Sequence, residues 1–363
     1  MIVIKPNPTP HMITVLVIAS NACNLDCTYC YRDHSTEKTL KYETFEKYIK
    51  NIVSYFHPET PLNIIFHGGE PLIAGYDFYE KAFILLDSFD REIHKGIQTN
   101  LTLLDDKFIK LFKANNCSIG TSLDGDDEIN NKTRPFKNSA NSSYQIVTEK
   151  IALLRQFDMS TGVISVLTDF NMNAKRYYDF AKNLNVRSVS FSPMFDYGNT
   201  DMENPAYEKL IDFLIQLFDL WIADDNPPEF DLYKTISHSL LGCIPINKCS
   251  FVEDCTRGIM TIDVDGSVYS CNHFLGQKEY SYGNVLTMPF EQIWNSPIRT
   301  KLSQRSKEIV KKCGACKYWD ICHGGCMSHT NDRINEKDYF CKMYQRLFSH
   351  IEKTLNETIG SQA

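Results

Sequence analysis

Cysteine is the residue type with the most evident chemistry in this sequence, and three of its thirteen cysteines stand close together near the N-terminus. Cys23, Cys27 and Cys30 fall within eight residues, just after an apolar run. Three thiolates leave one iron of a four-iron cluster without a protein ligand. Because a catalytic metal site keeps one position open, the triplet predicts an iron–sulfur active site. The alternatives are a zinc site or a chance group of buried thiols.

Most of the other cysteines lie in the last third of the chain. Eight of them would close two four-iron clusters, and they are Cys249, Cys255, Cys271, Cys313, Cys316, Cys322, Cys326 and Cys341. Residues 260–269 alternate around an Asp-Gly pair, which predicts a tight β-hairpin that brings the flanking cysteines together. A zinc ribbon formed by Cys313, Cys316, Cys322 and Cys326 is the alternative. Cys243 could replace Cys249 as a ligand, and Cys117 is expected to be buried and apolar.

Six short runs rich in β-branched residues are expected to form the strands that position Cys23, Cys27 and Cys30. Each run is followed by a segment with the periodicity of an amphipathic helix. The expected strands are residues 13–20, 62–66, 93–98, 117–123, 162–167 and 188–192. Parallel strands with right-handed crossovers curl toward a barrel, so the predicted fold class is α/β, a partial (β/α)6 barrel. Active sites in such folds lie where the strands end, and the cysteine triplet is placed there.

Two domains are expected. A helix ending near Asp224 is followed by Asp-Asn-Pro-Pro, a stretch that stops a helix, and beyond it the alternation of strands and helices ends. We therefore predict a barrel domain over residues 1–235. Residues 236–363 are predicted to form a cysteine-rich domain with a β-hairpin, short helices and a C-terminal helix.

The spacing C-x3-C-x2-C, with an aromatic residue before the last cysteine, resembles the radical S-adenosylmethionine (SAM) superfamily. The resemblance implies that the open iron binds SAM. The residues that it implies around SAM are Tyr29, Gly68, Gly69, Glu70, Ser122, Asp124 and Arg134. The Gly-Gly-Glu turn resembles the loop that holds the methionine amine, and the last three residues resemble positions that hold the ribose and the methionine carboxylate.

The C-terminal cysteines, over about residues 243–345, resemble the SPASM extension of radical enzymes that modify peptides and proteins. This resemblance implies two auxiliary clusters, so that the cofactors would be SAM and three [4Fe-4S] clusters. By position, one auxiliary cluster would be held by Cys249, Cys255, Cys271 and Cys326, and the other by Cys313, Cys316, Cys322 and Cys341.

The layout is also similar to that of anaerobic sulfatase maturases, which oxidise Cys or Ser to formylglycine. Those enzymes carry an aspartate, the proposed base, directly after the hairpin cysteine, and here that position is Asn272. An amide cannot act as a general base, and the neighbouring His273 is the other candidate catalytic residue. We therefore expect a maturase of a ribosomally made peptide that forms a carbon–carbon crosslink such as a cyclophane, or a related modification. Sulfatase maturation is the alternative.

Partners follow from this chemistry. The radical would act on a peptide or protein substrate, and an electron donor such as flavodoxin or ferredoxin would supply the electron. Only 22 residues precede Cys23, so leader binding would use another surface or a separate leader-binding protein. A formal charge of −7 argues against nucleic acid.

The sequence has no signal peptide and no apolar run long enough to span a membrane, so we expect a cytoplasmic protein without membrane contact. Two alternatives come from other classes of protein. One is a non-catalytic iron–sulfur or zinc scaffold. The other is a barrel hydrolase with incidental cysteines, which would leave the cysteine spacings unexplained.

Overall fold

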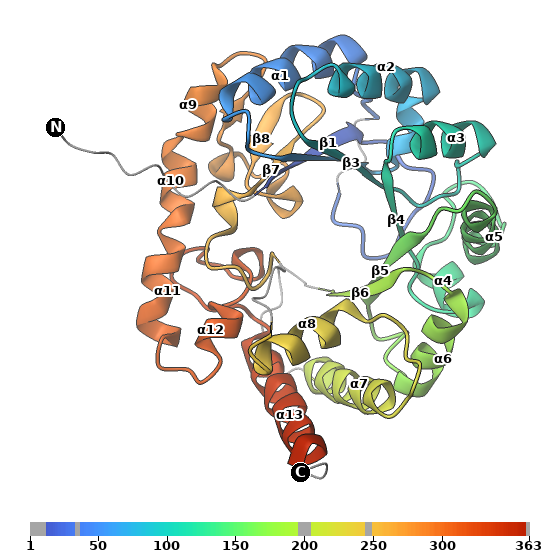
Figure 1. The fold of residues 1–363 in the computed structure, drawn as a ribbon, viewed down its shortest axis with the longest axis vertical. Coiled ribbons are helices and arrows are strands. Elements are labelled where there is room, and N and C mark those ends of the chain that lie inside the picture. The colour runs from blue at the N-terminus through green and yellow to red at the C-terminus, as the bar shows by residue number, and fades with distance from the viewer. Residues whose placement is uncertain (1–11, 33–36, 195–204, 244–248, 361–363) are drawn as a thin grey trace.

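The computed structural model describes residues 12–32, 37–194, 205–243 and 249–360, and its strands form one open, curved sheet (Figure 1). The strand order is β6-β5-β4-β3-β2-β1-β7-β8-β9. The first six strands are all parallel to their neighbours, and they are β1 (Ile13–Ser20), β2 (Leu62–Gly68), β3 (Ile93–Gln98), β4 (Ser118–Ser122), β5 (Thr161–Leu167) and β6 (Ser188–Pro193). Each predicted strand is present within two residues at either end, which confirms the predicted α/β partial barrel.

Helices cover the outer face of this sheet (Figure 1). They are α1 (Tyr42–Tyr55), α2 (Tyr76–Asp87), α3 (Asp106–Ala114), α4 (Asp127–Thr133), α5 (Ser143–Gln156), α6 (Ala174–Leu184), α7 (Pro205–Ile222) and α8 (Asp231–Leu240). In α1 the apolar residues recur at spacings of three and four, so that Phe45, Ile49 and Ile52 are all fully buried against the sheet. Burying each such side chain stabilises the fold by about 1.5–3 kcal/mol.

The C-terminal region begins with the predicted hairpin, formed by β7 (Ile259–Ile262) and β8 (Ser267–Tyr269), and β9 (Gly283–Asn284) follows. Gly266 in its turn has a φ of 84°, a conformation that glycine adopts without strain. The sequence did not predict that β7 would pair in parallel with β1. This pairing places the hairpin beside the strand that leads into the N-terminal cysteines.

Short helices complete the C-terminal region opposite α5 and α6 (Figure 1). They are α9 (Phe290–Trp294), α10 (Pro297–Ser303), α11 (Arg305–Cys313) and α12 (Trp319–Cys322), and the long α13 (Cys341–Gly360) ends the described chain. Because the predicted limit between residues 235 and 236 falls inside α8, and the sheet continues across both parts, the division into two domains stays a prediction. None of the helices in the described ranges combines the length and the apolar character that membrane crossing requires.

Candidate active site

The three N-terminal cysteines lie on the loop that leaves β1, where the parallel strands end. The backbone amide of Thr28 attaches this loop to the end of α4 by donating to the carbonyl of Thr133 at 2.9 Å. Burial raises the pKa of Cys23 to about 11 and the pKa of Cys27 to about 12, and the nearby Cys30 raises both further. The structure therefore gathers these three thiols at one place.

The glycine turn after β2 packs directly on the backbone that leads into the cysteines. Gly68 has a φ of 153°, and a Cβ added there would lie 2.1 Å from the carbonyl oxygen of Ser20. A Cβ on Gly69 would lie 2.5 Å from the carbonyl oxygen of Ala22. Only glycine permits this close approach. The two glycines therefore allow the turn to pack against the start of the cysteine loop. The sequence alone did not predict this contact.

Glu70 is fully buried and connects two loops of the rim. One of its carboxylate oxygens accepts hydrogen bonds from the amide of Leu72 at 2.9 Å and the hydroxyl of Thr99 at 2.7 Å, and the other accepts from the amide of Asn100 at 2.7 Å. Burial outweighs these bonds and raises the pKa of Glu70 to about 7. Because its side chain is used inside the protein, any contact of this turn with a ligand must come from the backbone.

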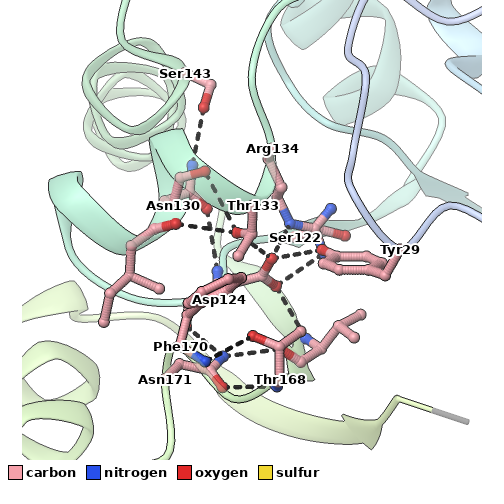
Figure 2. Close-up of polar contacts among 12 residues, drawn as sticks. Tyr29, Ser122, Asp124, Asn130, Thr133, Arg134, Ser143, Thr168, Phe170 and Asn171 are labelled. Atoms are coloured by element: carbon pink, nitrogen blue, oxygen red, sulfur yellow. Dashed lines mark hydrogen bonds and ion pairs between the residues drawn. The ribbon is translucent and has the colours of Figure 1, made fainter.

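The remaining residues predicted around SAM meet beside the cysteine loop (Figure 2). Asp124 lies just after β4 and pairs with Arg134, with a distance of 3.0 Å from the arginine Nε to the carboxylate. The hydroxyl of Tyr29 donates to the same carboxylate at 2.5 Å. Ser122 ends β4, and its hydroxyl accepts from Gln98 at 3.2 Å. All four predicted residues thus come together, while their roles toward a ligand stay predictions.

Asn272 and His273 follow the hairpin cysteine and reach the N-terminal site. The side-chain amide of Asn272 donates to the hydroxyl of Tyr31 at 2.7 Å. The ring of His273 stacks on Tyr31 with 5.2 Å between ring centres. Burial and nearby positive groups lower the pKa of His273 to about 4. The two residues therefore occupy the junction between the C-terminal region and the N-terminal cysteine loop.

The eight C-terminal cysteines lie in two groups. Burial raises the pKa of Cys255 well above its usual value, and the thiols that raise it further belong to Cys326, Cys271 and Cys249. The second group lines a single cavity and consists of Cys313, Cys316, Cys322 and Cys341. Cys117 is buried, as expected. The ligand roles, including a substitution of Cys243 for Cys249, stay predictions.

The donor sets fit iron–sulfur clusters by their composition. Within the described ranges, no three His, Cys, Asp or Glu side chains converge closely enough to hold a single metal ion. In a cluster each thiolate binds a different iron, so its sulfurs stand farther apart than the ligands of one ion. The first group supplies three thiols and the other two supply four each, which suits one open and two closed clusters.

Sequence reasoning missed several residues of this region. Tyr31 directly follows the last cysteine of the triplet, and this position was its only signal. Asp338 is 1% exposed and accepts a hydrogen bond from the amide of Cys326 at 2.7 Å, and His329 lies 3.3 Å from it. Asn100, by contrast, stands where the sequence places it, directly after the third strand at the rim of the site, and its side-chain nitrogen lies 3.9 Å from the sulfur of Cys23. Residues that support a site through the fold carry no sequence pattern of their own.

Comparison with known proteins defines the class. Residues 17–181 match the Radical SAM superfamily, and residues 249–317 match SPASM, an iron–sulfur cluster-binding domain. The chain is therefore a radical SAM enzyme with a C-terminal SPASM region. It belongs with enzymes whose cofactors are SAM and iron–sulfur clusters.

Individual relatives extend this result over the whole chain. A cysteine-type anaerobic sulfatase-maturating enzyme of Clostridium novyi is 29% identical, covering 93% of this chain and 96% of the relative. A serine-type enzyme of Bacteroides thetaiotaomicron is 27% identical, covering 91% and 86%. The structure of native anSMEcpe with bound AdoMet has a TM-score of 0.84 at 24% identity, covering 97% of this chain and 100% of that one. Streptococcus suis SuiB bound to its precursor peptide SuiA has a TM-score of 0.66 at 16% identity, covering 92% and 76%.

Proposed function

We propose that this enzyme is a maturase that oxidises a Cys or Ser side chain of a protein or peptide substrate to formylglycine. The observation that carries this proposal is the similarity, over nearly the full length, to sulfatase-maturating enzymes of both the cysteine and the serine type. The peptide crosslinking favoured by the sequence argument becomes the second candidate, since the likeness to the precursor-peptide enzyme SuiB extends only to the fold.

Bound at the N-terminal cysteines, the cluster and SAM would supply a 5′-deoxyadenosyl radical that abstracts hydrogen from the substrate. The chain's own residues would bind SAM and orient it toward the substrate. Arg134 would hold the methionine carboxylate, Ser122 a ribose hydroxyl, and the backbone of the glycine turn the methionine amine. Asn272 and His273 lie where the C-terminal region meets this site, so they would contact the residue being modified.

The overall reaction removes two hydrogens from the target side chain. Serine becomes the aldehyde directly. Cysteine loses two hydrogens, and water then replaces its sulfur, which leaves as hydrogen sulfide. The 5′-deoxyadenosyl radical would take one hydrogen atom, and the second hydrogen would leave as a proton and an electron, which the auxiliary clusters would accept. The electron that starts SAM cleavage would come from a donor such as flavodoxin or ferredoxin.

Carbon–carbon crosslinking of a ribosomally made peptide, such as cyclophane formation, is favoured by one specific observation. The position after the hairpin cysteine carries an amide, Asn272, which donates a hydrogen bond to Tyr31 at 2.7 Å. An amide cannot take the proton of a substrate thiol or hydroxyl. A crosslinking reaction through carbon radicals has no such deprotonation at the start. In this case a separate leader-binding protein would be a further partner.

The reconstituted enzyme, reduced with dithionite, tests the two candidates on a Cys-x-Pro-x-Arg peptide and on the same peptide with Ser. For formylglycine formation we expect 5′-deoxyadenosine together with an aldehyde on the peptide that a hydrazide reagent captures. Mass spectrometry should show sulfur replaced by oxygen, with loss of two hydrogens, in the Cys peptide. Production of 5′-deoxyadenosine with no aldehyde on either peptide would count against the proposal.

Asn272→Asp sharpens this test because it adds the carboxylate that sulfatase maturases carry at this position. We expect the variant to form more aldehyde than the native enzyme if formylglycine formation is the reaction. Asn272→Ala serves as the matched control that removes the hydrogen bond to Tyr31 without adding a base. If a precursor peptide instead loses two hydrogens without gaining an aldehyde, crosslinking is the better account.

A further inference from the structure

The carboxylate of Asp124 sits at the centre of a buried hydrogen-bond network between β4, β5 and α4 (Figure 2). One oxygen, Oδ2, accepts from the hydroxyls of Tyr29 and Thr133 at 2.5 and 2.8 Å, and from Nε of Arg134 at 3.0 Å. The other, Oδ1, accepts from Nη2 of Arg134 at 3.0 Å and from the amide of Val166 at 2.9 Å. Asp124 therefore receives five hydrogen bonds from four residues.

This count decides what Asp124 is able to do. A carboxylate offers about four acceptor sites, and all of them are used inside the protein. The side chain is also fully shielded from solvent. Asp124 consequently has no acceptor left for a ribose hydroxyl or any other group of a ligand, although its position resembles one that contacts SAM. Its influence on a ligand must pass through the residues that it holds.

Arg134 is the partner through which this influence passes. Its guanidinium uses the edge formed by Nε and Nη2 to bind Asp124, which leaves Nη1 and the second hydrogen of Nη2 on the other edge. That second edge has the geometry that pairs with a carboxylate through two parallel hydrogen bonds. The guanidinium carbon lies 5.4 Å from the centre of the Tyr29 ring, on the cysteine loop. The charge of Arg134 also reaches the Cys27 thiol.

We propose that Asp124 is a positioning residue that fixes the free edge of Arg134 and the ring of Tyr29 beside the cysteine loop, so that this edge receives the carboxylate of SAM. The network also ties the backbone around it. The backbone amide of Asp124 donates to the side-chain oxygen of Asn130 at 3.1 Å, and its carbonyl accepts from the side-chain amide of Asn171 at 2.8 Å. Strand ends and the cysteine loop are thereby held as one rigid unit. This proposal depends on the radical SAM class and is independent of which product is formed.

The test uses the anaerobically reconstituted enzyme with Asp124→Asn, which keeps the shape of the side chain and removes its charge. An amide presents a donor to the guanidinium in place of an acceptor, so Arg134 should lose its fixed orientation. We expect the dissociation constant of SAM, measured by equilibrium dialysis, to rise about 10- to 100-fold. The iron content should stay at the native level, and the change of the reduced cluster's EPR spectrum on SAM addition should require correspondingly more SAM.

Asp126→Asn is the matched control. Asp126 stands two residues away and makes a similar double contact with Arg176, at 2.5 and 2.8 Å, but this pair is exposed on the outer side. Asn also retains the ability of Asp126 to cap α4. We expect this control to bind SAM as the native enzyme does. Equal weakening in both variants would mean a general structural effect and would overturn the proposal.

A double-mutant cycle with Arg134→Lys separates positioning from direct contact. Lysine keeps the positive charge but lacks the second edge, so Arg134→Lys alone should weaken SAM binding with the fold intact. Adding Asp124→Asn to it should then change the SAM affinity by less than about threefold, because the route through Arg134 is already lost. Additive losses would mean that Asp124 acts on SAM binding by a route other than Arg134, and they would overturn the proposal. If Asp124→Asn fails to fold, native SAM affinity in Arg134→Lys would still refute the proposal.

Discussion

The three N-terminal cysteines span eight residues of one loop, whereas the eight C-terminal cysteines are spread from Cys249 to Cys341. The loop is held from outside by buried carboxylates, since Glu70 fixes the neighbouring loops and Asp124 binds Tyr29. The C-terminal groups are brought together only by the fold of a region composed of short strands and helices. The N-terminal site is thus held in place by the protein before a cofactor binds. The C-terminal region, by contrast, is assembled around its cofactors.

The difference predicts how each region responds to loss of a ligand. A loop supported by the barrel keeps its fold when a cysteine is removed, because the strands and helices that carry it are stabilised by their own core. The segments that carry the C-terminal cysteines are short strands, short helices and loops, so cluster binding should provide a large part of the stability with which they hold together. The N-terminal cysteines should therefore govern activity, and the C-terminal cysteines should govern folding.

The largest expected effect is on activity in Cys27→Ala. Two thiols are too few to hold a cluster with a single open iron, so SAM cleavage should be lost completely. The free energy of unfolding of the barrel should change by less than about 1 kcal/mol, as is usual away from a packed core. The measurements are 5′-deoxyadenosine formation and thermal unfolding. Native SAM cleavage in this variant would contradict the claim that the N-terminal cysteines govern activity.

The next largest effect is on stability in Cys271→Ala. This thiol lies beside those of Cys326 and Cys249 in the first C-terminal group, and its loss should remove the stabilisation that the cluster gives to the region, about 3 kcal/mol or more. Limited proteolysis should then cut within residues 249–345 faster than in the native protein. Cys117→Ala is the control, because Cys117 is a buried thiol that belongs to the barrel core. It should cost only about 1 kcal/mol and leave the iron content unchanged.

The same contrast explains what the sequence could predict. The six parallel strands and the helix α1 follow from local periodicity, and the triplet follows from spacing within one loop, so both could be inferred with little error. The hairpin was also local, because an Asp-Gly turn defines it. Its pairing with β1 was not predictable, since residues more than two hundred positions apart meet only in the folded sheet. The networks of Glu70 and Asp124 were missed for the same reason.

The order of the two candidate functions shows a further limit. A single substitution, Asn272 for aspartate, directed the sequence argument toward crosslinking. The full-length similarity to sulfatase-maturating enzymes carries more information than one position, and it favours formylglycine formation. The structure adds that Asn272 is bonded to Tyr31, so its amide has a structural use that is independent of proton transfer.

A smaller effect is expected from pH at the N-terminal scaffold. Burial raises the pKa of Glu70 to about 7, above its usual value of 4.5. Between these values the folded protein keeps a proton that the unfolded chain releases, so the free energy of unfolding should fall as the pH rises from about 4.5 to 7, by about 3 kcal/mol. Glu70→Gln should remove this slope.

Hydrogen exchange of residues 62–75 at several pH values measures this effect locally. Glu80→Gln is the control, because Glu80 lies on the exposed face of α2, where it accepts a hydrogen bond from Tyr76 at 3.2 Å. That variant should keep the native pH dependence. A slope that persists in Glu70→Gln would show that the scaffold owes its pH response to another group.

The smallest expected effect concerns the reduction potential of the second C-terminal cluster. Lys312 and Lys337 line the cavity that contains its four cysteines, and neither makes an ion pair within the described ranges. By contrast, Lys317 is paired with Glu352 at 2.5 Å. A positive charge near a cluster stabilises the reduced form, which carries one more negative charge. Lys337→Gln should therefore lower the potential by about 20–50 mV at low salt.

A redox titration followed by EPR measures this shift, and it needs no substrate. Lys317→Gln is the matched control, since it removes a lysine of the same region whose charge is already balanced and which lies outside the cavity. Its shift should be smaller than that of Lys337→Gln, and added salt should reduce both. Equal shifts would mean that the potential responds to the total charge of the surface. The reduction potentials of the C-terminal clusters would then depend on the overall charge of the protein. This would sharpen the contrast with the N-terminal site, where single buried groups act at defined distances.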